Sequence, residues 1–422
     1  MPAKRGPMTT IKDSVHDHIS VGGVAEDLLD TGPVQRLRRV AQLGTVKLVY
    51  PSANHTRFEH SLGVYHLADR ALDSLGIEGT EAERVRAAAL LHDIGHAPFS
   101  HNVEELLHRH TGLYHDDVTD LLVDTEIGDV LLEHDLDPER IAGLIAGEGQ
   151  YGQLVSGELD VDRMDYLVRD AHHTGVPYGT IDHERLVREL TFADGDLVLD
   201  EGNVQTAESL LMARALMTPT VYAHPVARIS KAMLRRATER LIATPDIDAR
   251  SVRRMDDYDL ISALRMTPET EAFADRYDRR DLFKRAVWAE YDDTPASLRE
   301  ADHEAIRELE ADIAERASVS PSEIVLDVPA EPSMAESTSE VLGGGEVRRL
   351  GDHSPLVTAL RTAQARQWRM GVYTVADATD RVGKAAVDVL GLDIEGTLVS
   401  DVRQRVHATL DEFEADAAGV DE

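Results

Sequence analysis

The sequence predicts a mainly α-helical fold with a small β-hairpin and a helical C-terminal region. Most segments place apolar residues three or four positions apart, which is the spacing of one buried helix face. The hairpin is predicted over 190–199, where Asp194 and Gly195 separate two short apolar runs. The chain has 422 residues, more than one hydrophobic core usually organises, so we expect a main domain with additional parts.

The apolar spacing predicts the elements of the main domain in turn. A short strand and a turn lead into a helix over 33–43, which Thr31 or Asp30 caps and Pro33 starts. The helices that follow are predicted over 57–75, 81–94, 101–110, 115–134, 138–145 and 158–173.

The second half of the chain continues the helical pattern with two interruptions. A long helix over 204–243 is expected to kink near Pro219 and Pro225, because proline removes a backbone hydrogen bond. A short strand is predicted at 323–328. The remaining helices are predicted over 257–267, 270–278, 296–316, 354–370, 375–391 and 399–417.

A change in composition indicates where the parts of the chain meet. A stretch rich in proline and serine, followed by three glycines, is typical of a loop or linker. We therefore expect a main domain over 1–245, a helical extension over 246–328, a linker over 329–346 and a C-terminal helical unit over 347–422.

The composition excludes several classes of protein. There is no cysteine, so the chain forms neither disulfides nor thiolate metal sites. The first eight residues lack the apolar core of a secretory signal, and no apolar run is long enough to span a bilayer. We therefore expect a cytoplasmic protein that does not engage a membrane.

The formal net charge of −34 at pH 7 is spread through nearly every segment. A distributed negative surface favours solubility in concentrated salt, where screening weakens self-repulsion. Our hypothesis is a halophilic source organism. Circular dichroism tests it: we expect structure to be lost at low salt and regained at molar salt, and indifference to salt would contradict the hypothesis. The charge also argues against general nucleic-acid binding.

An apolar run over 87–91 leads into the adjacent pair His92-Asp93. If that helix continues, His92 and His96 lie on one face about one turn apart. An imidazole beside a carboxylate is costly to bury unless something pairs both groups, and a divalent cation would do so.

Two further segments carry side chains able to complete such a site. His60 begins an apolar helix, and Asp162 lies in a carboxylate-rich helical segment over 158–170. Two imidazoles and two carboxylates suit Mn, Fe, Zn, Ni or Mg. Taken singly, each residue is explained equally well as a helix cap, a satisfied core histidine or part of a solvated acidic face.

Three blocks of sequence together resemble a known family. They are Val49–Gly63, His92–His101 and Asp162–Asp170, which spell the order H…HD…D. In this order they resemble the HD-domain metal-dependent phosphohydrolases, and in detail the sterile-alpha-motif/HD-domain deoxynucleoside triphosphate triphosphohydrolases and their microbial relatives. The resemblance extends over about residues 11–240 and implies an HD-domain helical core. A lone HD dipeptide is weak evidence, whereas three long blocks in order are specific.

The resemblance implies roles for particular side chains. The expected ligands of one divalent metal ion are His60, His92, Asp93 and Asp162. The expected catalytic group beside the α-phosphate consists of His96, His115 and Glu104, with His101 at a neighbouring pocket position. Histidine suits proton transfer because it titrates near neutral pH, and a carboxylate partner holds its tautomer.

The resemblance also implies how a nucleotide is bound. The expected triphosphate contacts are Arg57, Arg163 and Tyr166, where relatives often have lysine in place of Arg163. The expected contacts around the sugar are Gln42, Asp170 and Tyr222, which would exclude a 2′-hydroxyl. Arg214 matches a further pocket position.

Asp30 and Arg38 match residues that read a guanine nucleotide at a regulatory subunit interface. A guanine nucleotide is therefore a candidate activator, although the expected basic residue near Thr9 is absent and no sterile-alpha-motif domain precedes the HD domain. A helix cap and a surface salt bridge explain the same two residues equally well.

The predicted reaction is the metal-dependent hydrolysis of a deoxynucleoside triphosphate to a deoxynucleoside and inorganic triphosphate. Two alternatives share the metal chemistry or the fold: another HD-superfamily nucleotidase or phosphodiesterase, and a non-catalytic nucleotide-sensing protein. Because relatives are oligomers, we expect a homo-oligomer, either a dimer or a tetramer.

Overall fold

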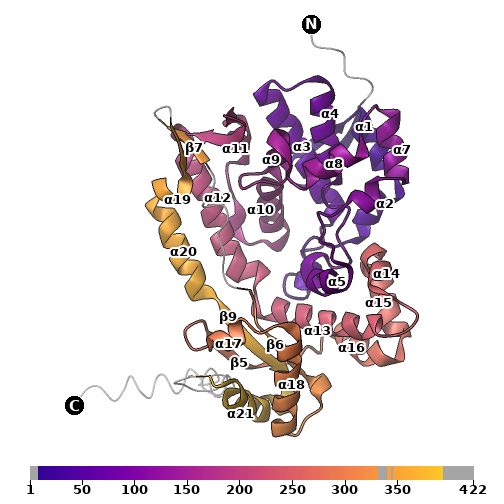
Figure 1. Ribbon diagram of the computed structural model, residues 1–422, viewed down its shortest axis with the longest axis vertical. Coiled ribbons are helices and arrows are strands. Elements are labelled where there is room, and N and C mark those ends of the chain that lie inside the picture. The colour runs from indigo at the N-terminus through magenta and orange to yellow at the C-terminus, as the bar shows by residue number, and fades with distance from the viewer. Residues whose placement is uncertain (1–7, 331–339, 344–345, 393–422) are drawn as a thin grey trace, which may run out of the picture. The chain divides into compact units, whose positions relative to one another are not determined.

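The computed structural model describes residues 8–330, 340–343 and 346–392. These residues form two compact units, residues 8–280 with 340–361 and residues 281–330 with 362–392. Helices dominate, and the sheets are small (Figure 1). The predicted fold class, mainly α-helical with minor β structure, is confirmed.

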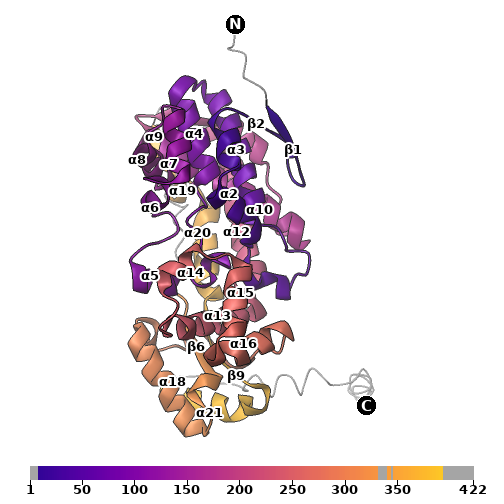
Figure 2. The same ribbon diagram turned by 90° about the vertical axis from the view of Figure 1, so that its right-hand side faces the viewer.

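The first unit is helical apart from two small sheets. An N-terminal hairpin of β1 (Thr9–Asp13) and β2 (Asp17–Val21) is paired antiparallel, and β2 packs against α3 (Figure 2). The helices are α1 (Val24–Leu29), α2 (Gly32–Arg36), α3 (Arg57–Leu75), α4 (Gly79–Leu91), α5 (Glu104–Thr111), α6 (Thr119–Leu122), α7 (Glu126–Glu133), α8 (Pro138–Ile145), α9 (Gly149–Val155), α10 (Val161–Thr174), α11 (His183–Arg188), α12 (Val204–Met217), α13 (Pro225–Ile242), α14 (Ala249–Arg254), α15 (Asp257–Met266), α16 (Pro268–Asp278) and α19 (Leu350–His353).

Helix α3 organises the first unit, because α4, α10 and α11 all pack against it. The carboxylate of Glu59 accepts a hydrogen bond of 2.6 Å from the backbone N–H of Thr56, which fixes the start of the helix. Gly76 ends the helix in the left-handed region at φ 67°. The helix predicted over 57–75 is confirmed, and it carries His60 in its first turn.

The helix that leads into the HD pair is shorter than predicted, because α4 ends at Leu91. His92 and Asp93 lie in the turn that follows, so the helical face expected for His92 and His96 is not formed. Gly95 allows this turn to pack closely: a Cβ on Gly95 would lie 2.0 Å from the carbonyl oxygen of His115.

Other helices are divided where the sequence predicts continuity. The helix predicted over 33–43 is replaced by α2 and a 3-10 turn, Leu37–Arg39. The helix predicted over 115–134 forms α6 and α7, because Asp124 between them has a positive φ of 55°. The helices that were not predicted are α1, α9, α11, α14 and α19.

The kink predicted in the long helix over 204–243 is confirmed. Helices α12 and α13 are separated by a π-helical turn, Thr218–Tyr222, which contains Pro219. Pro225 occupies the first position of α13, where its missing N–H costs nothing.

The predicted hairpin is present and is larger than expected. Strands β3 (Leu190–Ala193) and β4 (Asp196–Asp200) pair antiparallel, and β7 (Glu340–Gly343) and β8 (Glu346–Arg349) extend the sheet in the order β3-β4-β7-β8. Val341 of β7 is buried opposite Leu199. Part of the segment predicted as a linker therefore belongs to a sheet. Val341 pairs there with Leu199, although serine, proline and glycine surround Val341 in the sequence.

The second unit contains a sheet that the sequence analysis mostly missed. Its strands are β5 (Lys284–Glu290), β9 (Arg369–Thr374) and β6 (Ile324–Asp327), in the order β5-β9-β6 with β9 antiparallel to both neighbours. Helices α18 (His303–Ala317) and α21 (Thr379–Leu390) pack against each other and the sheet. The short α17 (Ala296–Arg299) and α18 replace the single helix predicted over 296–316.

The single strand predicted in this unit, over 323–328, is confirmed as β6. Helix α20 (Pro355–Gln367) ends before β9 begins, so the end of the helix predicted over 354–370 is a strand. The helix predicted over 399–417 lies outside the described residues. The chain leaves the first unit after residue 280 and returns to it with β7, which differs from the four consecutive parts that we expected.

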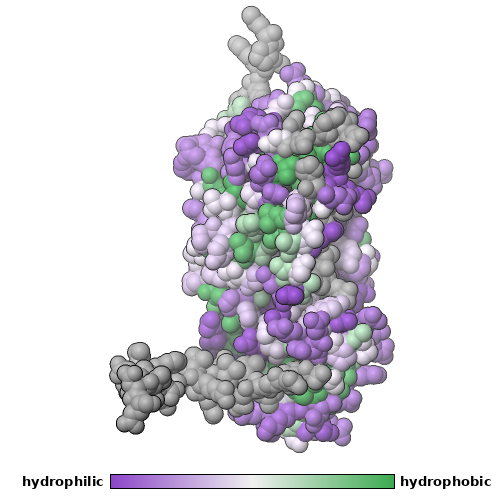
Figure 3. All heavy atoms as spheres, turned by 90° about the vertical axis from the view of Figure 1, so that its left-hand side faces the viewer, coloured by the Kyte–Doolittle hydropathy of each residue, from purple (hydrophilic) through white to green (hydrophobic). Residues whose placement is uncertain are grey.

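Hydrophilic residues are widespread on the face drawn in Figure 3, and several smaller hydrophobic areas lie between them. Among the helices of the described segments, none combines the length and the apolar character that crossing a bilayer requires.

The close packing of α3 on α10 predicts a destabilising substitution at Gly63. A Cβ at this position would lie 1.9 Å from Oδ1 of Asp165 and 2.5 Å from Nη2 of Arg169, which are both buried. We expect Gly63→Ala to lower the free energy of unfolding by about 1–3 kcal/mol, as overpacking typically does. Thermal and chemical denaturation measure the change. Ser74→Ala on the exposed side of α3 is the matched control, and equal stability of both variants would contradict the packing argument.

Candidate active site

Four predicted metal ligands converge where α3, the turn after α4 and α10 meet. His60 Nε2 lies 2.8 Å from Asp162 Oδ1 and 3.3 Å from His92 Nε2. His60 Nε2 also lies 3.7 Å from Asp93 Oδ2, and His92 Nε2 lies 3.4 Å from Asp93 Oδ1. One donor atom from each of His60, His92 and Asp93 therefore lies within 4.8 Å of the other two, and the Asp162 carboxylate lies beside both histidines. We call these four residues the HD cluster.

The ring nitrogens that point away from the HD cluster are also occupied. His60 Nδ1 lies 2.7 Å from Oδ2 of Asp165, and His92 Nδ1 lies 2.9 Å from the carbonyl oxygen of Ala89. Histidines that bind metals commonly donate their second nitrogen in this way, which fixes the tautomer and turns the other nitrogen toward the ion. The donor set therefore fits a divalent cation of the type that binds nitrogen and oxygen.

Asp165 is a site residue that the sequence analysis missed. It is fully buried and also contacts His16 Nε2 at 2.6 Å and Arg169 Nε at 2.8 Å. Burial alone would raise the pKa of Asp165, but the charge of Arg169 and the hydrogen bonds from both histidines hold it well below its usual value. The spacing of Asp162 and Asp165, one helical turn apart, is the signal that could have indicated it.

Arg57 pairs with the HD cluster from the first position of α3. Its Nη1 lies 3.0 Å and 2.9 Å from the two carboxylate oxygens of Asp93, and its Nε donates to Oγ of Ser100 at 2.9 Å. Burial would raise the pKa of Asp93, but Arg57 and the nearby histidines hold it well below its ordinary value. Asp93 is therefore ionised and available as a ligand near neutral pH.

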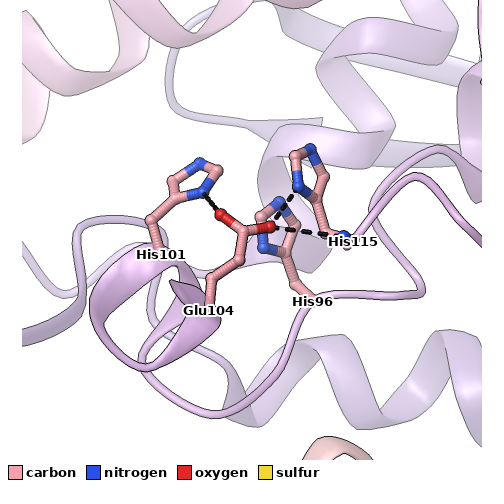
Figure 4. A group of neighbouring side chains, drawn as sticks. All are labelled: His96, His101, Glu104 and His115. Atoms are coloured by element: carbon pink, nitrogen blue, oxygen red, sulfur yellow. Dashed lines mark hydrogen bonds and ion pairs between the residues drawn. The ribbon is translucent and has the colours of Figure 1, made fainter. Parts of the chain in front are cut away.

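A second group of titratable side chains lies beside the first. His96, His101, Glu104 and His115 each direct one nitrogen or oxygen to within 4.8 Å of the others (Figure 4). Glu104 accepts hydrogen bonds from Nδ1 of His101, at 2.7 Å, and from Nδ1 of His115. The His96 and His115 rings stack with centroids 4.2 Å apart. We call these residues the HHEH cluster, in which the structure brings His101 together with the predicted group of His96, His115 and Glu104.

The surroundings of the HHEH cluster shift the pKa values of its histidines in different directions. Burial lowers the pKa of His115, but the hydrogen bond and charge of Glu104 outweigh burial and raise it. Burial lowers the pKa of His96 well below its ordinary value. His115 is thus the member of the cluster best suited to carry a proton at neutral pH.

A pocket of about 470 Å³ lies against both clusters within the first unit. Its wall includes most of the residues that the sequence predicts: Gln42, Arg57, His92, Asp93, His96, His101, His115, Asp162, Tyr166, Asp170, Arg214 and Tyr222. The volume is in the range of small-molecule binding sites. The pocket therefore joins the two clusters to the residues expected around a sugar.

Both carboxylate oxygens of Asp170, in the expected sugar region, have partners within the protein. Its Oδ2 accepts a hydrogen bond of 2.9 Å from the hydroxyl of Tyr222, and its Oδ1 lies 2.7 Å from Nε2 of His55. His55 is buried and stacks on His173 with ring centroids 4.4 Å apart. His55 was not predicted, although it lies in the first sequence block.

Three predicted contacts lie outside the pocket wall. Arg163 donates to the carbonyl oxygen of Gly157 and lies 3.2 Å from Asp160 Oδ2, the cap of α10. Asp30 is the exposed C-cap of α1, and the guanidinium of the exposed Arg38 lies 3.6 Å from the centroid of the Phe58 ring. The proposed contact of Arg163 with phosphate and the regulatory roles of Asp30 and Arg38 stay predictions.

Asp257 of α15 ties two segments of the pocket wall together. Its carboxylate accepts hydrogen bonds from the backbone N–H groups of Phe99, at 2.6 Å, and Ala41, at 3.1 Å. The neighbouring Ser100 hydroxyl donates to the carbonyl oxygen of Ala41 at 2.7 Å. Phe99 and Ser100 both have positive φ angles, of 58° and 55°, so this backbone depends on such contacts.

We expect Asp257→Asn to reduce turnover while leaving the metal content unchanged. Asparagine has one acceptor oxygen, so one of two buried N–H groups loses its partner at a cost of about 1–3 kcal/mol. The displaced segments carry Gln42 and His101 on the pocket wall. Steady-state kinetics and elemental analysis measure the two effects. Asp275→Asn, on the surface of α16, is the control; a variant with normal kcat, or one that also loses its metal, would contradict this role.

Comparisons with known proteins identify the family to which the chain is similar. The HD domain family matches residues 57–170, and the HD associated region family matches residues 181–401. The uncharacterized protein MJ1154 of Methanocaldococcus jannaschii is 32% identical over 414 residues, which are 94% of this chain and 88% of that protein. A solved phosphohydrolase structure from Bacteroides thetaiotaomicron has a TM-score of 0.70 and 26% identity, over 87% of this chain and 100% of that chain.

A relative with a named activity matches a smaller part of the chain. The deoxynucleoside triphosphate triphosphohydrolase SAMHD1 homolog of Dictyostelium discoideum is 33% identical over 246 residues, which are 53% of this chain and 48% of that protein. The family matches confirm the resemblance that the three sequence blocks indicate, and the helical core and the HD cluster agree with it. The chain belongs to the HD-domain phosphohydrolase family.

Proposed function

We propose that this protein hydrolyses deoxynucleoside triphosphates to a deoxynucleoside and inorganic triphosphate. The observation that carries the proposal is the single pocket wall that combines three residues of the HD cluster, three residues of the HHEH cluster and the Asp170–Tyr222 pair. A metal, a proton donor and a sugar-binding region are the three parts that this reaction requires. The similarity to the SAMHD1 homolog of Dictyostelium discoideum favours the same substrate class.

In this proposal His60, His92, Asp93 and Asp162 hold one divalent ion. A bound ion would supply Lewis-acid polarisation of a phosphate oxygen and help to orient a water nucleophile. The nitrogen and oxygen donors are compatible with Mn, Fe, Mg, Ni or Zn, and manganese is our first choice for assay.

The triphosphate would be neutralised by basic groups of the pocket wall. Arg57 and Arg214 both line the pocket, and Tyr166 adds a hydroxyl donor. Stabilising charge on the phosphate oxygens is the main task of the protein in phosphoryl transfer. Arg163 would add its positive charge only after its guanidinium leaves Gly157 and Asp160 and contacts a phosphate instead.

The leaving 5′-oxygen needs a proton, which we assign to His115. The Glu104 carboxylate holds the His115 ring through Nδ1, which leaves Nε2 on the far side of the ring. The raised pKa of His115 keeps a larger fraction protonated near neutral pH. His96, our second choice from sequence, has a pKa well below its ordinary value, so it is less suited to donate a proton.

The sugar would bind against Asp170, Tyr222 and Gln42. Because His55 and Tyr222 already hold both oxygens of Asp170, this wall has little freedom to move aside. A rigid wall would discriminate against the additional 2′-hydroxyl of a ribonucleotide.

Product analysis tests the proposed function. Purified protein with manganese is incubated with each dNTP and each NTP, with and without a guanine nucleotide. We expect deoxynucleoside and intact triphosphate from dNTPs, and much slower turnover of NTPs. Release of pyrophosphate or orthophosphate would favour another nucleotidase or phosphodiesterase of the family, and a lack of turnover with all metals would favour a nucleotide-sensing role.

Several accompanying properties are part of the same proposal. We infer a homo-oligomer, a dimer or a tetramer, and a cytoplasmic, halophilic setting in agreement with the charge of −34. Activation by a guanine nucleotide at Asp30 and Arg38 is tested in the incubation described above. Substitution of Arg38 should then abolish activation without changing basal turnover.

A further inference from the structure

The HHEH cluster has the composition of a metal site in its own right. Three imidazoles and one carboxylate are a common ligand set for Zn²⁺, which prefers four nitrogen, sulfur or oxygen donors in a tetrahedron. One donor atom from each of His96, His101, Glu104 and His115 lies within 4.8 Å of the other three. All four side chains come from the segment 96–115, which runs from the turn after α4 to the loop after α5, and they gather around Glu104 (Figure 4).

A second observation points to a ligand at the same place. His96 is 1% exposed, and its Nδ1 has no hydrogen-bond partner, while its Nε2 lies 3.1 Å from Oδ1 of Asp93. A buried ring nitrogen without a partner costs free energy that a cation would recover. A ring held at one nitrogen by a carboxylate and free at the other is also the usual arrangement of a metal-binding histidine.

The cluster is accessible to an ion. His96, His101 and His115 line the pocket, and the side chain of His101 is 52% exposed while that of His115 is 34% exposed. Arg57, a basic side chain of the same pocket wall, is engaged by both carboxylate oxygens of Asp93. An ion entering the pocket therefore reaches the cluster without displacing buried apolar side chains.

We propose that His96, His101, Glu104 and His115 form a second divalent-metal site, selective for zinc, beside the HD cluster. The two sites are linked through Asp93 and His96. Binding at the second site does not depend on the proposed function. If the proposed function is also correct, zinc at the second site inhibits turnover, because it occupies the nitrogens of the group that donates the proton.

Zinc stoichiometry tests the second site. The full-length protein is stripped with a chelator, equilibrated with Zn²⁺ in excess of two ions per chain, freed of unbound ion and analysed by elemental mass spectrometry. We expect two zinc ions per chain for the wild type. Glu104→Gln and His115→Gln should each bind one, and His60→Ala should retain the second ion while losing the first. His110→Gln, on the exposed face of the same helix α5 as Glu104, is the matched control and should bind two.

The outcomes separate the alternatives. One zinc per wild-type chain, or two in Glu104→Gln, would overturn the proposal. His101→Gln changes an exposed side chain and gives a second measurement if a buried substitution disturbs folding, which circular dichroism monitors. Failure of the proposed function would appear as absent nucleotide turnover with unchanged stoichiometry. Activity with manganese that falls as the second equivalent of zinc binds would support both.

Discussion

His92→Ala is expected to abolish turnover and to remove one metal equivalent without unfolding the protein. His92 supplies one of two imidazole nitrogens in the HD cluster, and its other ring nitrogen, Nδ1, lies 2.9 Å from the backbone carbonyl oxygen of Ala89. Because a bound Lewis acid supplies several kcal/mol and each 1.4 kcal/mol is tenfold in rate, we expect a loss of about a thousandfold or more. Elemental analysis, product assays and circular dichroism measure the three parts of this prediction.

Asp93 needs a gentler substitution than alanine. Removing its carboxylate leaves the buried guanidinium of Arg57 without its partner, which typically costs about 3–5 kcal/mol, so Asp93→Asn is the better variant. Asp165→Asn provides a graded comparison, because loss of a partner that orients a ligand weakens metal binding about 10- to 100-fold. Retained turnover in a metal-free His92→Ala, Asp93→Asn double variant would refute the assignment. His134→Gln on the surface is the control.

The sequence predicts the site better than it predicts the fold around it. His60, His92, Asp93 and Asp162 are far apart in the chain, but each lies within a sequence block specific enough to align them, and the structure brings them together. The supporting residues escaped notice because their roles depend on tertiary contacts. Asp257 lies far from the sequence blocks, and only the fold reveals that it accepts two backbone N–H groups of the pocket wall.

The missed elements have a similar cause. Strand β9 follows α20 without a proline or glycine between them, so apolar residues of a strand extend the apparent helical pattern. In strand β5 the adjacent residues Ala286 and Val287 are both buried, so the strand does not alternate between buried and exposed residues. A short apolar run of that kind cannot be distinguished from a helix by periodicity. The break between α6 and α7 depends on Asp124, whose positive φ no spacing rule anticipates.

His115→Gln is expected to lower kcat by about 100-fold or more, the usual contribution of a positioned general acid. Metal at the HD cluster should remain, because His115 contributes no atom to it. Since the acid must be protonated, wild-type turnover should fall as the pH rises through the raised pKa of His115. That alkaline decline should be absent from the residual activity of His115→Gln, whereas His110→Gln on α5 should keep the wild-type profile.

Glu104→Gln distinguishes proton donation from a structural role of the cluster. The carboxylate is what raises the pKa of His115 against the effect of burial, so a neutral amide should let that pKa fall. The alkaline decline in kcat should then move to lower pH, with turnover largely recovered in acidic buffer. A residue that only supports the fold would lower kcat equally at all pH values. A uniform loss in Glu104→Gln, or an unchanged alkaline limb in His115→Gln, would therefore assign the proton donor to another group of the pocket wall.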